Sequence, residues 1–305
     1  MTVPEAVATV KITKQQALRL VDSLTPYEAA VVDVLLDVHV ATLDQLGLAV
    51  STAATEHDRA IVAGRAVAKL ERLGFILRHP IDVRGSKRQV AFPLSNGAVA
   101  AATCDRPGDP VRRRERRDAR LVNSRVLGHA LGVSGIYAAF AACREHGRLV
   151  IWQHDEEIIA FSSGGSLRRI RPDAYAVWQW HTGEEQRFFL EYERRPRRLE
   201  TSEKVQQYYR YWDGGAYFRR EDSRIFPGLL FITPDVARVR TCLQAFGWAT
   251  MPGNIREYFR PSVTSADHIA VEGILSQIWY GGPEVVSFVD TVPASAAPKH
   301  QSRGY

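Results

Sequence analysis

The segment that decides the fold of the second half of the chain is Arg187–Glu193, which reads RFFLEYE. Apolar residues fill positions 188–190, and two acids, Glu191 and Glu193, stand two positions apart. Side chains at positions i and i+2 of a β-strand lie on the same face of the sheet. The segment therefore predicts a strand that presents both carboxylates on one face.

A third acid precedes this strand. Asp173 follows Pro172 near the start of another strand-like run, Ile170–Trp180, which we expect to pair with the RFFLEYE strand. Clustered carboxylates repel one another unless a cation binds them, and hard oxygen ligands suit Mg²⁺, which also engages phosphate. The pattern predicts a magnesium site formed by Asp173 and Glu191, with Glu193 beside them.

The elements around these strands predict a mixed β-sheet flanked by helices, in the order αβββαβ followed by a further helix. The expected elements are a helix over 118–147, strands over 149–159, 170–180 and 187–193, a helix over 200–218, a strand over 227–233 and a helix over 235–247.

The N-terminal part has a different pattern, which predicts three helices followed by a β-hairpin. Thr25 and Thr42 stand where helix N-caps are expected, and a third helix over 57–73 ends at Gly74. Two strand-like runs then enclose a basic turn at residues 84–88. This order is typical of a winged helix-turn-helix, a fold that binds DNA and that also serves as a protein-docking module.

Basic residues on these elements favour double-stranded DNA as the partner, because arginine forks suit phosphate oxygens. The segment 111–120 packs six arginines into ten positions, which predicts either sequence-independent DNA contacts or a solvated linker. A second arginine cluster lies at 194–198. The outward face of the third helix carries Arg59, Arg65, Lys69 and Arg72. The candidate DNA-binding residues are Arg59, Arg65 and Lys69 on this helix, Arg84, Lys87 and Arg88 at the hairpin tip, and Arg112, Arg113, Arg114 and Arg116 before the second domain.

A Pro-Asp on one strand and a Glu-x-acid on the next, within an αβββαβ core, resembles the PD-(D/E)xK restriction-endonuclease fold. The whole chain resembles the plasmid replication-relaxation family. The motifs that carry this resemblance are Leu24-Thr25, Arg65-x-x-x-Lys69-Leu70-x-x-Leu73-Gly74-Phe75-Ile76, His129-x-Leu131, Arg171-Pro172-Asp173-Ala174, Phe189-Leu190-Glu191-Tyr192-Glu193-Arg194 and Lys204-x-x-x-Tyr208 with Tyr211. The resemblance implies a role in replication and DNA relaxation of plasmids or mobile elements, with a replication initiator or a relaxase as a conceivable protein partner.

The nuclease pattern is altered at one position. A lysine normally stands two residues after the glutamate, whereas this chain has Glu193 there, and Lys204 on the next helix is the candidate to supply the ammonium instead. If the site is active, it nicks DNA with Mg²⁺ held by Asp173 and Glu191, assisted by Glu193 and Lys204. The alternative is a non-enzymatic transcriptional regulator or adaptor with a degenerate nuclease-like domain, in which Glu193 pairs with a nearby arginine.

Composition fits a two-domain α+β and α/β protein of the cytoplasm. The chain has 305 residues, a net charge of +6, a pI near 9.3 and three scattered cysteines, which give no disulfide framework. No apolar run is long enough to cross a membrane. The sequence does not predict an oligomeric state. The expected parts are a flexible leader over 1–20, the winged helix over 21–100, a basic linker over 101–118, the nuclease-like domain over 119–287 and a disordered tail over 288–305.

Overall fold

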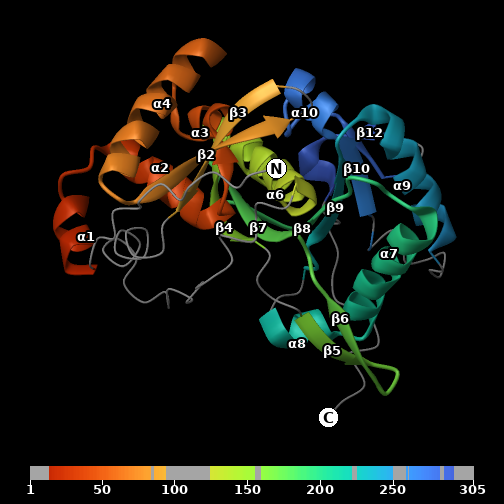
Figure 1. Ribbon diagram of the computed structural model, residues 1–305. Coiled ribbons are helices and arrows are strands. Elements are labelled where there is room, and N and C mark those ends of the chain that lie inside the picture. Colours follow the sequence, from red (N-terminus) through yellow and green to blue (C-terminus); the bar gives the residue numbers. More distant parts are fainter. Residues whose placement is uncertain are drawn as a thin grey trace. The chain divides into compact units, whose positions relative to one another are not determined.

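The computed structural model divides the chain into two compact units, residues 1–142 and 143–305 (Figure 1). Each unit is considered by itself. The structure describes residues 14–83, 86–93, 124–154, 159–221, 225–249, 259, 261–281 and 285–291.

The first unit combines helices with a small antiparallel sheet. Its elements are α1 (Lys14–Val21), α2 (Pro26–Val38), β1 (Ala41–Thr42), α3 (Leu43–Val50), α4 (Glu56–Arg72), β2 (Ile76–Val83), β3 (Ser86–Pro93) and α6 (Ser124–Ala142). The strands are arranged in the order β1-β3-β2, and β2 and β3 form a hairpin whose pairing runs from Ile76 opposite Pro93 to Val83 opposite Ser86.

Helices α2 and α3 of this unit begin where the sequence predicts. Thr25 and Thr42 both form capping boxes, in which the threonine hydroxyl accepts from the backbone N–H three residues on and that residue's side chain accepts from the threonine N–H. Gly74, with a φ of 77°, follows α4, as expected from the tolerance of glycine for left-handed backbone. These caps fix the boundaries of α2, α3 and α4.

Helices α3 and α4 approach each other closely at Gly47. A Cβ atom added at Gly47 would lie 2.7 Å from the carbonyl oxygen of Arg59, so only glycine allows the two backbones to pack at this distance. The buried core around this contact is apolar and includes Val31, Leu35, Val38, Leu46, Val67, Leu70 and Phe75.

Helix α6 belongs to the first unit, although the sequence pattern assigned it to the second domain. The hydroxyl of Ser134 donates to the carbonyl of Val40 (2.5 Å), and Gln45 Nε2 donates to the carbonyl of Leu131 (2.8 Å). Its periodicity predicted a helix but could not identify the partner. The leader was also expected to be flexible to residue 20, whereas Lys14–Val21 forms α1, and Leu20 and Val21 pack against the first core.

The second unit is built around a seven-stranded mixed sheet. Its elements are β4 (Gly147–His154), β5 (Ile159–Ser163), β6 (Ser166–Ile170), β7 (Ala174–Trp180), β8 (Glu185–Tyr192), α7 (Arg198–Asp213), α8 (Ala216–Glu221), β9 (Gly228–Thr233), α9 (Val236–Trp248), β10 (Pro261–Ser265), α10 (Ala266–Glu272), β11 (Trp279–Tyr280), β12 (Val285–Val286) and the 3₁₀ helix η3 (Phe288–Thr291). The predicted combination of helices with a mixed sheet is confirmed.

The sheet order is β12-β11-β10-β9-β8-β7-β4. Strand β7 is antiparallel to both β4 and β8, whereas β8, β9 and β10 are mutually parallel. Strands β5 and β6 form a separate hairpin, which Figure 1 shows beside α7 and away from the large sheet. The strand predicted over 149–159 is therefore two elements, β4 and the first residue of β5, with the residues between them outside the described part of the chain.

The first residues of the segment expected to be a disordered tail, Phe288–Thr291, form the 3₁₀ helix η3. Phe288 is fully buried and contacts the rings of Trp180, Phe188 and Trp279, and Gln186 Nε2 donates to its carbonyl (2.6 Å). The expectation failed because a single aromatic side chain docks in the core despite its polar and small neighbours in the sequence. None of the helices in the described residues combines the length and hydropathy that a bilayer crossing requires.

Candidate functional site

The three acids singled out from the sequence lie where β7 and β8 meet. The Asp173 N–H donates to the carbonyl of Leu190 (2.9 Å), and a carboxylate oxygen of Asp173 accepts from the Tyr192 N–H (2.7 Å). Glu193 follows the last residue of β8 and still pairs with β9, because its N–H donates to the carbonyl of Ile232 (2.8 Å). The backbone therefore holds Asp173 next to the end of β8, on which Glu191 is placed.

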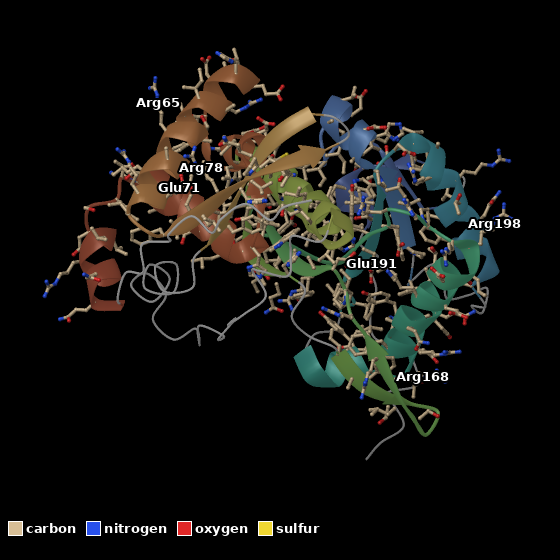
Figure 2. All side chains as sticks on the ribbon, viewed as in Figure 1. Arg65, Glu71, Arg78, Arg168, Glu191 and Arg198 are labelled. Atoms are coloured by element: carbon tan, nitrogen blue, oxygen red, sulfur yellow. The ribbon has the colours of Figure 1, made fainter. Side chains whose placement is uncertain are left out.

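Lys204 of α7 reaches both glutamates. Its Nζ lies 2.8 Å from Glu191 Oε2 and 2.5 Å from Glu193 Oε1. The two carboxylates thus meet one ammonium group, as expected for side chains two positions apart on a strand. We refer to Asp173, Glu191, Glu193 and Lys204 as the carboxylate cluster; Figure 2 labels Glu191 beside α7, on the side of the strands.

Tyr208 completes the cluster, and the sequence interpretation did not assign it a role. Its hydroxyl donates to Glu191 Oε1 (2.6 Å), so both oxygens of this carboxylate have a donor. Residues i and i+4 of a helix lie on the same face, and the Lys204-x-x-x-Tyr208 spacing was the signal that could have placed them together. Ring contacts of Tyr208 and Tyr211 with Phe189 hold this face of α7 against β8.

Burial differs strongly within the cluster and controls its electrostatics. The side chain of Glu191 is 1% exposed and that of Glu193 is 17% exposed, whereas Lys204 is 37% exposed. Burial, helped by the Asp173 charge, raises the pKa of Glu191 to about 7 against the opposing effect of the Lys204 ammonium. Burial alone would lower the pKa of Lys204, but Glu191 and Glu193 raise it overall, so the lysine stays charged.

The cluster does not fit a divalent cation as it is arranged. Both oxygens of Glu191 accept hydrogen bonds, one oxygen of Asp173 accepts the Tyr192 N–H, and the Lys204 ammonium contacts both glutamates. Among the described residues, no group of three or more His, Cys, Asp or Glu is arranged to hold a metal ion. The positive charge that clustered carboxylates require comes from the chain itself.

The basic residues on the outward face of α4 fall into two groups. Arg65 and Arg72 are exposed, and Figure 2 shows Arg65 extending away from the helix. Lys69 instead pairs with Glu28 of α2 (2.7 Å), and Arg59 is half-buried, with Nη1 at 3.5 Å from the carbonyl of Ala53. The side chains of Lys87 and Arg88 on β3, together with Arg84, Arg112, Arg113, Arg114 and Arg116, lie outside the described residues.

One family model matches a stretch of the chain that includes both the candidate DNA-binding helix and the carboxylate cluster. The model of the replication-relaxation family matches residues 33–227, which is more than half of the chain and includes α4 and the whole carboxylate cluster. The chain belongs to the replication-relaxation family. Comparison with curated proteins and with solved structures found no match. Family membership connects the protein with replication or relaxation and leaves the chemistry of the site to be argued from its geometry.

Proposed function

We propose that this protein binds double-stranded DNA during replication or relaxation of a plasmid or mobile element, through a winged helix in its first unit. The order α2–β1–α3–α4–β2–β3, with the strands arranged β1-β3-β2, supports a winged helix-turn-helix. In that fold the second helix of the pair, here α4, enters the major groove and the hairpin reaches adjacent phosphates.

The observation that carries this proposal is the exposed basic face of α4. Arg65 and Arg72 lie seven residues apart on a helix, two turns along the same side, and both are exposed. The close α3–α4 contact at Gly47 holds this face in a fixed orientation. Two exposed guanidinium groups on that surface suit DNA phosphates, which arginine engages in bidentate pairs.

A titration of the full chain against a short fluorescent duplex tests the proposal. Replacing Arg65 and Arg72 with serine should weaken binding on every sequence and reduce the salt-dependence slope by about 1–2 units, since each phosphate contact contributes about 0.9. Arg240→Ser, which removes an exposed arginine from α9, is the matched control and should change neither quantity. Unchanged affinity and slope in the double variant would contradict DNA binding by α4.

For the second unit we propose a nuclease-like fold that does not cleave DNA. The strand order β4-β7-β8-β9 with α7 between β8 and β9 supports the nuclease-like topology. Lys204 lies beside Glu191 and Glu193, where the active-site hypothesis also places its ammonium. These ion pairs support the non-enzymatic proposal because both carboxylates that a metal would need face that ammonium.

A cleavage assay on supercoiled plasmid distinguishes a metal-dependent nuclease from a non-enzymatic, nuclease-like fold. We expect no metal-dependent nicking above the level of an Asp173→Asn control with either Mg²⁺ or Mn²⁺. Nicking by the wild-type protein that requires the metal and is lost in Asp173→Asn would establish a nuclease and refute the non-enzymatic proposal.

A further inference from the structure

Four arginines follow Glu193 of the carboxylate cluster in the sequence. The segment 194–198, Arg-Arg-Pro-Arg-Arg, connects the end of β8 to the first residue of α7. We call it the arginine turn. All four of its arginines are exposed, and the α4-based proposal gives them no role.

The position of the arginine turn is fixed at both ends. On one side, the N–H of Glu193 donates to Ile232 of β9, and its carboxylate binds Lys204. On the other side, the N–H of Thr201 donates to the carbonyl of Arg197, which is the first hydrogen bond of α7. The four arginines are therefore presented on a short, anchored connection adjacent to the cluster.

The acids that flank the arginine turn in the sequence each pair with a cation. Glu193 binds Lys204, as Glu191 does, and Glu200 pairs with Arg197 (2.8 Å). Residues 194–200 contain four arginines and one glutamate, a formal charge of +3. The Arg197–Glu200 pair is 74% and 64% exposed, so it contributes little stability and a phosphate can replace the carboxylate at small cost.

We infer that the arginine turn is a second nucleic-acid contact, which binds the phosphodiester backbone without reading bases. Guanidinium forks match phosphate oxygens in pairs, and adjacent arginines on one turn match the regular spacing of charge along a strand. Because the ammonium of Lys204 offsets the buried carboxylates, a phosphate can approach this edge of the sheet without meeting two uncompensated negative charges. The inference rests on the proposed DNA-binding function and assigns the second unit a share in it.

The test is a salt-dependent titration of the full chain in which Arg195, Arg197 and Arg198 are all replaced with serine. Loss of three phosphate contacts should reduce the slope of log affinity against log salt by about 2–3 units and weaken binding about 10-fold or more at moderate salt. Arg240→Ser serves as the control. Replacing the same three residues with lysine should preserve much of the slope, because the charge remains.

The outcomes distinguish this site from α4. If the triple serine variant binds as the wild type does, the arginine turn does not contact DNA, whatever the Arg65/Arg72 variant shows. If only the triple variant loses affinity, α4 is not the DNA-binding face and the arginine turn is. Should circular dichroism show that the triple variant is unfolded, Arg195→Ser alone should still lower the slope by about 1 unit, and an unchanged slope there would overturn the inference.

Discussion

Each unit of the molecule contains a lysine that the sequence pattern assigned to a candidate site and that binds a glutamate. Lys69 lies 2.7 Å from Glu28, and Lys204 lies 2.8 Å from Glu191. The two lysines are equally exposed, at 36% and 37%, but Glu28 is 11% exposed and Glu191 only 1%. The distances are the same, so the burial of the acid is what separates the pairs.

The net pKa shifts of the two acids are opposite, although each lysine lowers the pKa of its partner. Burial acts to raise the pKa of Glu28, but hydrogen bonds from Lys69 and the Thr25 N–H lower it overall. For Glu191 burial prevails, and its pKa is raised to about 7. The Lys69–Glu28 pair therefore joins two helices at the surface of one unit, whereas Lys204 compensates the charge of the buried Glu191 carboxylate.

The largest effect should come from Lys204→Met. Removing the ammonium leaves Glu191 buried without its cation, which should cost about 3–5 kcal/mol in the free energy of unfolding. The pKa of Glu191 should rise further, above the ordinary value of 4.5 that it has in the unfolded chain. The folded state then holds a proton that the unfolded state releases, so stability should fall as pH rises above about 4.5.

Denaturant unfolding of this variant at several pH values measures both the loss in the free energy of unfolding and the direction in which stability changes with pH. Adding Glu191→Gln to Lys204→Met should restore part of the loss, because no buried charge is then left alone. A loss below about 1 kcal/mol, the range of exposed pairs, would show that the cluster is solvated and that the two lysines are equivalent.

The next effect in size should come from Tyr208→Phe. This change removes the donor to Glu191 Oε1 and leaves that oxygen buried, at a cost of about 1–3 kcal/mol. Tyr211→Phe is a comparison variant on the same face of α7, because the ring of Tyr211 also contacts Phe189. Equal stability of Tyr208→Phe and the wild type would mean that water already satisfies the carboxylate.

A smaller effect is expected from Lys69→Met. The partly exposed pair should contribute about 1 kcal/mol or less. Glu28 keeps its hydrogen bonds to Thr25 in the capping box, so α2 should remain intact by circular dichroism. A loss as large as that of Lys204→Met would remove the distinction between the two pairs.

The smallest effect should be the pH response of Glu28, and its sign should be opposite to that of Lys204→Met. Because the pKa of Glu28 is lowered in the fold, its contribution is present above about 4.5 and is lost as pH falls through the folded-state value. Glu28→Gln should therefore flatten the acid limb of the stability profile of the wild type. An unchanged acid limb would show that Glu28 titrates alike in the folded and unfolded states.

Local signals predicted most of the fold. Thr25, Thr42 and Gly74 marked helix ends correctly because capping depends on neighbouring residues. The i, i+2 spacing of Glu191 and Glu193 placed both side chains against one partner for the same reason.

The errors all involve contacts between distant parts of the chain. Glu28 lies 41 residues before its partner Lys69, and Gln45 of α3 lies 86 residues before Leu131 of α6. The ring of Phe288 contacts Phe188 of β8, and its carbonyl accepts from Gln186, which lies 102 residues earlier. Periodicity shows that a side chain will be buried or charged, but it does not show against which element.

The most direct test of the central claim, that Lys204 rather than a divalent cation neutralises the carboxylate cluster, is a Mn²⁺ titration followed by electron paramagnetic resonance. We predict that the wild-type protein binds no stoichiometric Mn²⁺ at millimolar metal, with the same signal from Asp173→Asn. One bound Mn²⁺ per chain in the wild type, lost in both Asp173→Asn and Glu191→Gln, would contradict the claim and restore the metal site.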